Sequence, residues 1–441
     1  MRKSSLMLLA AILAGVVLGA PRYCVKMRAS GDTGMETPES FPGSHALVGC
    51  PQYWTPQGED TWVGDVSMLT FNGRLHLFYL KDRHHHGMAE GMGCHGFGHI
   101  SATPELTDWM EHPDAVPVTE WWHSLGTGTP FVKDGKLCLA YGLHTERVPG
   151  WKELKLPAGA TWAESEDGIR FKPSGVVFHE TRNPTVFNRD DGLFGMIIGY
   201  KDENGKGVGG MLASKDLLEW KMIDAELPGK GDCPCYFIWN GHHYLLQGFT
   251  QFFHSKTGVP GSWENWAEVG DDPYDGLSVP MVCEIANERR ILAGWIRHPY
   301  GWGGWLAFRE LRQRSDGRID MCWLSEMSFP AAEYQFAAGE KAVVAYHSAR
   351  GHKPIFLSVD PVARTAEWKS GVESKGKHAY DLRVVSIRNV RGLDSPYRVK
   401  VIAWYDERHD VTIFDAEIAG VRTLVTRRFG RYESLGVRKF D

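Results

Sequence analysis

The alternation of apolar and polar residues along the chain predicts short β-strands joined by tight turns. One hairpin unit recurs: an apolar run with period two, a turn that contains Gly or Asn, and a second run that ends in an aromatic residue. Asn-Gly and Asp-Gly pairs are typical of such turns, because these residues accept a positive φ. The unit is found at Phe71–Tyr79, Lys133–Tyr141, Arg189–Tyr200, Trp239–Phe249 and, in weaker form, Ala286–Trp295.

A second element follows most of these hairpins: a small or polar residue, a short acidic or polar turn, and an aromatic residue. It occurs at Ser101–Trp109, Ala163–Phe171 and Ala213–Trp220, and it predicts a third strand, a turn and an outer fourth strand. Five such four-stranded units predict a five-bladed β-propeller over residues 45–330. A sandwich of irregular strands is the competing interpretation, and it does not explain why the two-part unit recurs.

The pattern changes after residue 330, where strand-like runs continue without the hairpin unit. These runs predict a small β-sandwich over residues 335–441, packed on the propeller, and the fold class is therefore all-β. The runs are Lys341–Tyr346, Pro354–Val359, Tyr380–Ile387, Tyr397–Trp404, Val411–Phe414 and Thr423–Arg428.

Composition agrees with a turn-rich fold and excludes some partners. The 50 Gly and 23 Pro residues are about 17% of the 441 residues, against roughly 12% in average usage. The 49 basic and 54 acidic residues give a net charge of −5, without the basic excess or stripe of a nucleic-acid-binding protein. We therefore expect no nucleic-acid partner.

The first 20 residues have the pattern of a secretory signal peptide. Arg2 and Lys3 precede an apolar run over Leu6–Val17, and Ala20 is a small residue at a plausible cleavage point. The alternative, a membrane anchor, needs about 20 apolar residues, and this run is shorter. We expect a secreted or periplasmic protein that is not attached to a membrane after cleavage.

Eight cysteines and one histidine run raise the questions of disulfides and metal binding. The cysteines are irregularly spaced, and Cys233 and Cys235 lie too close for a C-x-x-C motif, so we expect buried thiols or one or two bridges. His84–His86 lie within a segment, Lys81–Gly98, that is predicted to form a loop at the rim of the pocket. Adjacent side chains of an extended segment point in opposite directions, so we expect no metal and no cofactor.

Three polar residues precede hairpins at the same place in their units. Asp65, Asn183 and Asp232 lie just before the first, third and fourth hairpins. In a propeller the innermost strands converge on an axial pocket, so folding is expected to bring these side chains together. A single Asp before a strand is more often a turn residue. The same placement in three units is what favours a catalytic role for these residues.

Several motifs around these residues resemble those of the glycoside hydrolase family 32/68 superfamily, the five-bladed β-fructosidases. Family 32 is the closest in layout, because it adds a C-terminal β-sandwich. The family's W-x-N-D-P-N-G and the Y-H-L-F-Y strand are matched by Trp62–Ser67 and Leu75–Tyr79. The family motifs W-G-H-A-x-S-x-D-L-x-x-W, S-G-S, R-D-P and E-C-P are matched by Phe97–Trp109, Thr127–Thr129, Arg182–Pro184 and Asp232–Pro234. Later matches are Arg290–Trp295, Gly301–Gly304, Arg309–Leu311 and Val411–Phe414.

The resemblance implies roles for the three polar residues. Asp65 is implied as the nucleophile, Asp232 as the acid/base, and Asn183 as the residue that stabilises the transition state. Two motifs depart from the family, since Asn183 replaces an Asp and Asp232 replaces a Glu; Gly64 also replaces an Asn. An acid needs a raised pKa, which we expect from burial of Asp232 against Cys233, Pro234 and Trp239.

Substrate contacts are expected from residues that lie inside or beside the matched motifs. The candidates are Trp62, Arg182, His99, Thr127 and Trp302, with Trp121 and Trp122 as further aromatic candidates. Aromatic rings would cover the apolar face of a sugar, and Arg182 would orient a neighbouring carboxylate.

The function predicted from this resemblance is a secreted glycoside hydrolase that acts on a small carbohydrate substrate. It would cleave a furanosidic bond, for example a β-fructofuranosidic one, in a di- or oligosaccharide by a retaining mechanism with two carboxylates. A wider gap between the carboxylates would instead favour inversion. The alternatives are a carbohydrate-binding propeller without catalysis, and an arabinofuranosidase or phosphorylase; Arg182 alone is weak support for a phosphate site.

Overall fold

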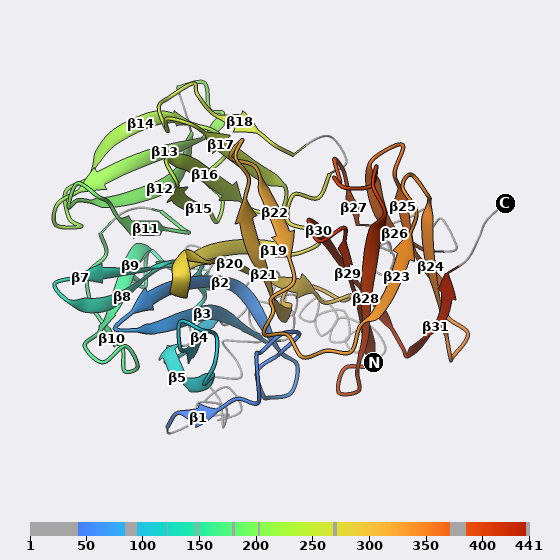
Figure 1. Ribbon diagram of the computed structural model, residues 1–441. Coiled ribbons are helices and arrows are strands. Elements are labelled where there is room, and N and C mark those ends of the chain that lie inside the picture. The colour runs from blue at the N-terminus through green and yellow to red at the C-terminus, as the bar shows by residue number, and fades with distance from the viewer. Residues whose placement is uncertain are drawn as a thin grey trace, which may run out of the picture.

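The computed structural model describes residues 43–437, apart from 84–94, 121, 146–147, 149, 179–180, 202, 268–270 and 371–384. This part of the chain is built almost entirely of β-strands, and Figure 1 shows them in two lobes, β2–β22 in one and β23–β31 in the other. The predicted signal peptide, residues 1–20, lies outside the described residues. Within the described residues, no helix has the length and apolar character needed to cross a bilayer.

The first lobe consists of five groups of consecutive antiparallel strands, the blades of the predicted propeller. Blade 1 comprises β2 (Thr61–Phe71), β3 (Arg74–Arg83), β4 (Gly96–Ala102) and β5 (Met110–Val116), with β1 (His45–Ala46) at its outer edge. Blade 2 comprises β6 (Leu125–Gly126), β7 (Pro130–Lys133), β8 (Lys136–Leu143), β9 (Gly159–Ser165) and β10 (Lys172–Pro173). Blade 3 comprises β11 (Thr185–Asn188), β12 (Phe194–Lys201), β13 (Gly207–Ser214) and β14 (Lys221–Leu227).

The last two blades complete this lobe. Blade 4 comprises β15 (Cys235–Trp239), β16 (His242–Gln247), β17 (Gln251–Ser255) and β18 (Glu264–Asn265). Blade 5 comprises β19 (Ser278–Glu284), the single-turn 3-10 helix η3 (Ala286–Glu288), β20 (Arg290–Arg297), β21 (Gly304–Gln313) and β22 (Ile319–Cys322). Blades 1 and 5 meet where Val63 of β2 pairs with Gly304 of β21, which joins the first and last blades into one sheet.

The predicted hairpin turns are confirmed. Asn72 and Gly73, between β2 and β3, both have positive φ, at 47° and 72°. The turns at Asp134–Gly135, Asn240–Gly241 and Asn287–Glu288 share this conformation. Positive φ at both central residues matches the right-handed twist of the flanking strands, which is why Asn, Asp and Gly occupy these places.

The predicted turn between the third and fourth strands is also confirmed, and its aromatic residue has a specific partner. The Trp109 indole Nε1 donates to the Leu106 carbonyl at 2.8 Å, and Trp220 makes the same bond to Leu217. Leu106 and Leu217 have positive φ, so their carbonyls turn inward toward the indole. The repeated aromatic residue therefore closes the outer turn of its blade.

The second lobe is a sandwich of two antiparallel sheets. One sheet is formed by β23 (Ala332–Phe336), β28 (Tyr397–Asp406), β29 (Val411–Ile418) and β30 (Arg422–Phe429). The other is formed by β24 (Ala342–Ser348), β25 (Ile355–Asp360), β26 (Thr365–Ser370), β27 (Ser386–Ile387) and β31 (Tyr432–Val437). The predictions missed β23, β26 and β31, and residues 380–384 of one predicted run lie outside the described residues. We propose that the boundary between the two lobes lies between Cys322 and Ala332.

Buried ion pairs join the sandwich to the propeller. Arg309 of β21 and Asp415 of β29 are fully buried, and their side chains lie 2.8 Å apart. Tyr53 OH donates to the same carboxylate at 2.8 Å. A buried charge is tolerated only where an opposite charge and hydrogen bonds compensate it, so this contact requires both lobes to be in place.

Candidate active site

Asp65 lies at an irregular point of β2. The pairing of β2 with β3 shifts register between Val63 and Val66, so Gly64 and Asp65 fall outside the regular ladder. A Cβ atom on Gly64 would lie 1.9 Å from Cη2 of Trp302, so a larger residue here would displace this indole. The Asp65 side chain is buried, with 5% exposure.

Glycines of the preceding blades let the loops that carry Asn183 and Asp232 approach the site. A Cβ on Gly142 of β8 would lie 1.5 Å from the Arg182 carbonyl oxygen, and one on Gly199 of β12 would lie 2.2 Å from that of Lys230. The two loops are also joined directly, because Thr185 Oγ1 donates to the Pro234 carbonyl at 2.6 Å. The Arg-Asn-Pro and Asp-Cys-Pro segments therefore lie against each other.

Asp65 is held by neutral donors. Thr127 Oγ1 donates to Oδ2, and the Trp295 indole Nε1 donates to Oδ1 at 3.2 Å. Burial raises the pKa of Asp65 from 3.8 to about 6, although these hydrogen bonds oppose the shift, and the charge of Asp232 adds to it. Desolvation of the charged form thus outweighs the hydrogen bonds that stabilise it.

The Cys233 sulfur lies between the two carboxylates. Its Sγ is 3.5 Å from Asp65 Oδ2 and 3.6 Å from Asp232 Oδ1. The sum of those two distances sets an upper limit of roughly 7 Å on the separation of the two oxygens. The separation typical of retaining glycosidases, about 5–5.5 Å, lies within this limit. Burial, with the two carboxylates beside it, holds the pKa of the Cys233 thiol well above its ordinary value, so the sulfur stays protonated and neutral.

Asn183 leaves one acceptor unused. Its Nδ2 donates to Cys233 Sγ at 3.5 Å, while Oδ1 is buried and has no hydrogen-bond partner among the described residues. A buried acceptor without a donor is costly. A hydroxyl group of a bound ligand is a donor that would satisfy it.

Asp232 lies differently from the sequence-based expectation. Its side chain is exposed, so the predicted burial against Cys233, Pro234 and Trp239 was wrong. The reason is the left-handed backbone of Cys233, with φ of 43°, which directs the sulfur inward and leaves the preceding carboxylate facing solvent. Gln247 holds this loop, because its Oε1 accepts hydrogen bonds from the backbone N–H groups of Lys230 and Gly231 at 2.9 and 3.0 Å.

Comparison with known proteins identifies the family of the chain. Residues 57–239, which include all three polar residues, match the model of the glycosyl hydrolases family 32 N-terminal domain. This match and the curated relatives support membership of the glycoside hydrolase family 32 superfamily. Raffinose invertase of Escherichia coli is 25% identical over 303 residues, and sucrose-6-phosphate hydrolase of Bacillus subtilis is 24% identical over 298 residues.

These matches cover 58% and 60% of this chain, and the chain spans about three-fifths of the two relatives, 61% and 58% of their lengths. A solved GH32 β-fructofuranosidase of Bombyx mori has a TM-score of 0.63 at 16% identity, covering 95% of this chain and 96% of that one. Fructan 1-exohydrolase IIa from Cichorium intybus has a TM-score of 0.59 at 13% identity, covering 87% and 93%. These structures share the all-β fold of propeller and sandwich.

The structure brings together most of the residues predicted from the family 32 motifs. Thr127 donates to Asp65, as described above. Trp302 is half-buried over Gly64, and its ring centroid lies 5.3 Å from that of Trp295 and 5.0 Å from that of His95. The residues that meet are Asp65, Thr127, Asn183, Asp232 and Trp302.

Trp62 does not contribute a stacking surface, which corrects the prediction. Its side chain is 2% exposed, and its ring packs 4.3 Å from that of His298 and 4.2 Å from that of His409. Its Nε1 donates to Asp60 Oδ1 at 2.8 Å. The residue is part of the core where blades 1 and 5 meet the sandwich, and no face of the ring is open to a sugar.

The predicted substrate contact by His99 is also wrong, because His99 lies in β4 with its side chain inside blade 1. It is fully buried, its Nε2 lies 3.0 Å from His76 Nδ1, and its ring stacks on Phe78 at 4.5 Å. Burial, reinforced by His112, His76 and Arg74, holds the pKa of His99 well below its ordinary value. The residue is a neutral part of the blade 1 interior.

The other candidates are at the surface or outside the described residues. The Arg182 side chain is exposed, and its carbonyl oxygen lies 3.3 Å from His144 Nε2. Trp122 is half-buried and packs edge-on against His123, whereas Trp121 and His84–His86 lie outside the described residues. The part of the chain that the structure describes contains no group of three or more His, Cys, Asp or Glu side chains placed to hold a metal ion.

Two functional side chains were missed from the sequence. Trp295 is the aromatic residue that ends the fifth hairpin unit, and this repeated position was the signal that could have identified it. Cys233 was considered only as an apolar neighbour of Asp232. The described cysteines are free thiols: Cys50, Cys138, Cys233, Cys235, Cys283 and Cys322.

Proposed function

We propose that this protein is a glycoside hydrolase that cleaves a β-fructofuranosidic bond in a di- or oligosaccharide. The observation that carries the proposal is the approach of the Asp65 and Asp232 carboxylates to one sulfur atom, within roughly 7 Å of each other. Membership of family 32, and the invertase and sucrose-6-phosphate hydrolase named among its relatives, support this choice of bond.

The proposed mechanism retains the anomeric configuration. An inverting enzyme needs carboxylates about 6.5–9.5 Å apart, and the upper limit of roughly 7 Å excludes most of that range. Asp65 attacks the anomeric carbon, and Asp232 transfers a proton to the oxygen of the leaving group. Asp232 then removes a proton from the water that hydrolyses the glycosyl ester of Asp65.

The buried position of Asp65 suits the nucleophile, and the exposed position of Asp232 suits the acid/base. The Asp65 carboxylate is held in place by Thr127 and Trp295, and neither donor neutralises its charge. The exposed Asp232 is accessible both to a leaving group and to water. Because the protein does not bury this carboxyl, the raised pKa that an acid needs has to come from a bound substrate that excludes water around it. Because the pKa of Asp65 is about 6, the nucleophile is ionised above that pH and becomes protonated below it.

Asn183 supplies a hydrogen-bond acceptor to a sugar hydroxyl through its unpartnered Oδ1. An uncharged amide stabilises a positively charged, oxocarbenium-like centre less than a carboxylate does. We therefore expect slower turnover than that of relatives with Asp at this position. Asn183→Asp tests this point directly, and a higher kcat is the expected result.

A substrate screen tests the proposal. The purified protein is incubated with sucrose, raffinose, 1-kestose and inulin, and released fructose is measured, with Asp65→Asn as the matched control. The expected result is fructose release by the wild type alone, with the β-anomer as the first product in NMR spectra. A first product of inverted configuration would contradict the retaining mechanism.

The second candidate is a carbohydrate-binding propeller without catalysis. It is favoured by one observation, that Asn183 stands where the family motif has an Asp. Saturable sugar binding in calorimetry, without any hydrolysis over days, would favour it over the hydrolase.

Export of the protein is also proposed, on the pattern of residues 1–20. N-terminal sequencing of protein from the culture medium or periplasm tests it, and cleavage after Ala20 is the expected result.

A further inference from the structure

An open pocket lies between the propeller and the sandwich, and it shares no residue with the Asp65 site. Its volume is about 610 Å³, including the open mouth. Five arginines line it: Arg314 and Arg318 from the β21–β22 hairpin, and Arg388, Arg391 and Arg422 from the sandwich. The carboxylates of its wall are Asp271 and Asp320.

Three of these arginines are neutralised by carboxylates. Arg422 Nη2 lies 2.6 Å from Asp275 Oδ1 and 3.5 Å from Asp271 Oδ1. Arg391 pairs with Asp320. Arg314 pairs with Asp316 at 2.7 Å. The carboxylates around the pocket are therefore already committed to these three guanidinium groups.

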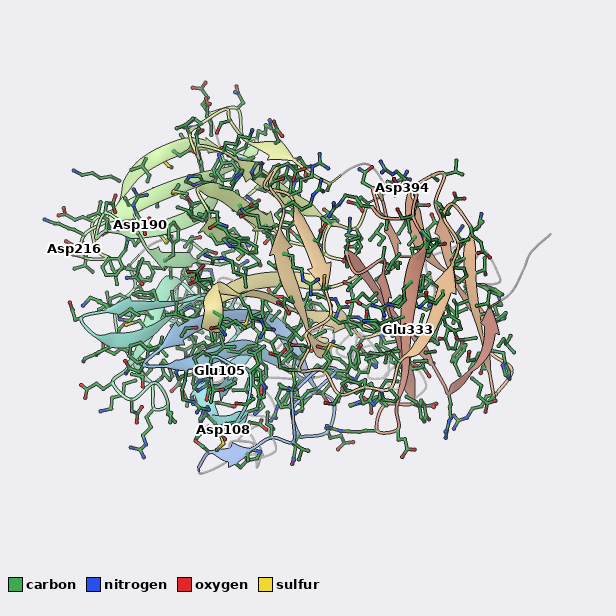
Figure 2. The ribbon with its side chains drawn as sticks, in the orientation of Figure 1. Glu105, Asp108, Asp190, Asp216, Glu333 and Asp394 are labelled. Atoms are coloured by element: carbon green, nitrogen blue, oxygen red, sulfur yellow. The ribbon has the colours of Figure 1, made fainter. Side chains whose placement is uncertain are left out.

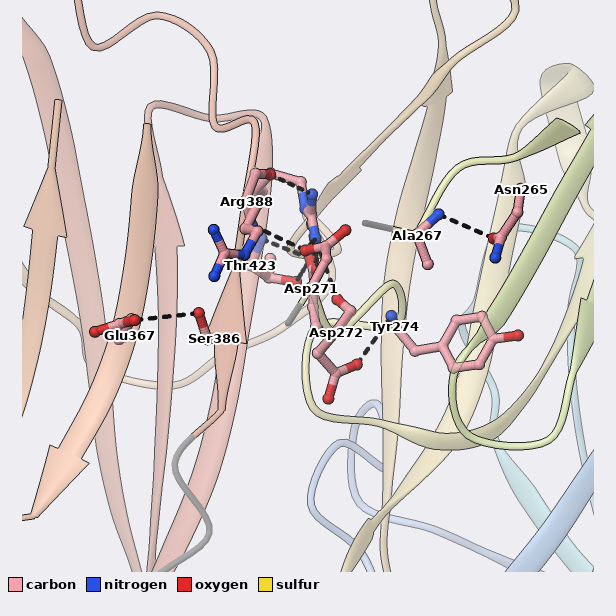
Figure 3. A network of polar contacts seen from close by, with 11 residues as sticks. Asn265, Ala267, Asp271, Asp272, Tyr274, Glu367, Ser386, Arg388 and Thr423 are labelled. Atoms are coloured by element: carbon pink, nitrogen blue, oxygen red, sulfur yellow. Dashed lines mark hydrogen bonds and ion pairs between the residues drawn. The ribbon is translucent and has the colours of Figure 1, made fainter. Parts of the chain in front are cut away.

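Among the described residues, the Arg388 side chain has no hydrogen-bond acceptor. Its backbone N–H donates to Asp271 Oδ1 at 2.8 Å, a contact drawn in Figure 3, where Asp271 faces Arg388 across the boundary between the lobes. Its Nε is buried and has no hydrogen-bond partner within the described ranges. A buried donor of this kind costs free energy unless a further group satisfies it.

Arg318 is the second arginine without a carboxylate partner among the described residues. Its guanidinium lies 5.8 Å from the ring centroid of Trp266, whose ring is stacked on His254 at 4.2 Å. The aromatic contact orients the guanidinium but accepts no hydrogen bond in its plane. The pocket thus holds a surplus of charged donors, one from each lobe.

We propose that this pocket binds a phosphate or sulfate group, either free or carried by a sugar, between Arg318 and Arg388. A tetrahedral oxyanion offers several acceptors, which suits the planar fork of donors on a guanidinium. Because Arg318 belongs to the propeller and Arg388 to the sandwich, the bound anion bridges the two lobes. Binding therefore stabilises the docked arrangement of the lobes.

The test uses the whole protein with inorganic phosphate and sulfate as probes, and with chloride at equal ionic strength. Calorimetry and thermal unfolding should show saturable binding and a rise in Tm for the oxyanions alone. The double variant Arg318→Gln/Arg388→Gln should bind about tenfold more weakly or worse. Arg170→Gln, at a side chain of blade 2 that is 87% exposed, is the matched control and should bind like the wild type.

A third arm distinguishes the source of the anion. Glucose 6-phosphate that binds more tightly than inorganic phosphate indicates a sugar-borne group, and equal affinity indicates a free anion. The single variant Arg318→Gln keeps the test valid if the double variant does not fold, because the exposed Arg318 side chain can be replaced without disturbing the core. This single variant should also bind the oxyanions more weakly. Equal stabilisation by chloride, or unchanged affinity in these variants, would overturn the proposal whatever the outcome of the fructose assay.

Discussion

Two buried carboxylates, one at the centre of the propeller and one at its junction with the sandwich, are compensated in different ways. Asp415 is fully buried against Arg309, which is also fully buried, at 2.8 Å. Burial raises the pKa of Asp415, but the Arg309 guanidinium opposes the shift. Asp65 is buried with the neutral donors Thr127 and Trp295. Burial raises the pKa of Asp65 to about 6, although these two donors oppose the shift.

The difference separates a structural carboxylate from a reactive one. An ion pair compensates the charge of Asp415, and the closed junction between the lobes keeps this carboxylate away from any substrate. A carboxylate held by neutral donors keeps its negative charge available to an electrophile. Other acidic side chains, such as Asp190 and Asp216 in Figure 2, lie at the periphery, where water solvates them.

The largest expected effect comes from removing the charge at the propeller axis. Asp65→Asn should lower kcat/KM by about 10⁴-fold or more, because no other described group is placed to form the glycosyl ester. Steady-state kinetics on whichever fructoside is cleaved measures it. Asp190→Asn, at an exposed turn, is the matched control, and activity of Asp65→Asn within tenfold of the wild type would refute the role of the nucleophile.

Breaking the ion pair at the junction should affect stability and leave the reacting groups intact. Arg309→Met should lower the free energy of unfolding by about 3–5 kcal/mol, because the Asp415 charge remains buried without its partner. Urea denaturation measures this change. The double variant Arg309→Met/Asp415→Leu should recover much of the loss, and a loss below about 1 kcal/mol in the single variant would show that the pair is not essential.

The same Asp65→Asn variant should gain stability, unlike a variant of the junction. The raised pKa means that the charged carboxylate disfavours the folded state, and this penalty develops as the pH rises from 3.8 through about 6. At pH 8 the variant should gain on the order of 2–3 kcal/mol, and near pH 3 it should gain little. Denaturant unfolding at both pH values checks it, and an equal gain at the two would contradict the linkage.

The smallest effect tests the neutral donors. Thr127→Val removes one hydrogen bond to the ionised form of Asp65, so the pKa of that carboxyl should rise above 6, by about one unit. The acidic limb of the kcat/KM profile should move to higher pH by the same amount. Thr127→Ser keeps the hydroxyl and should leave the limb in place; an unchanged limb in Thr127→Val would show that this bond does not tune the nucleophile.

Local patterns were sufficient to predict the architecture and part of the site. Asn72–Gly73 and its counterparts specify hairpins through backbone preferences that act over a few residues. Asp65, Asn183 and Asp232 could be selected because each precedes a hairpin. Thr127 and Trp302 followed from motifs of the family.

The burial of each candidate side chain and its hydrogen-bond partners depend on the packing of blades that are far apart in the chain. Trp295 reaches Asp65 across 230 residues, and the left-handed Cys233 reverses the expected burial of its neighbour Asp232. Trp62 and His99 are of residue types suited to sugar contacts, yet both are buried inside the protein. Alternation along a strand indicates which side chains share a face, whereas the water that each side chain retains depends on the elements packed against that face.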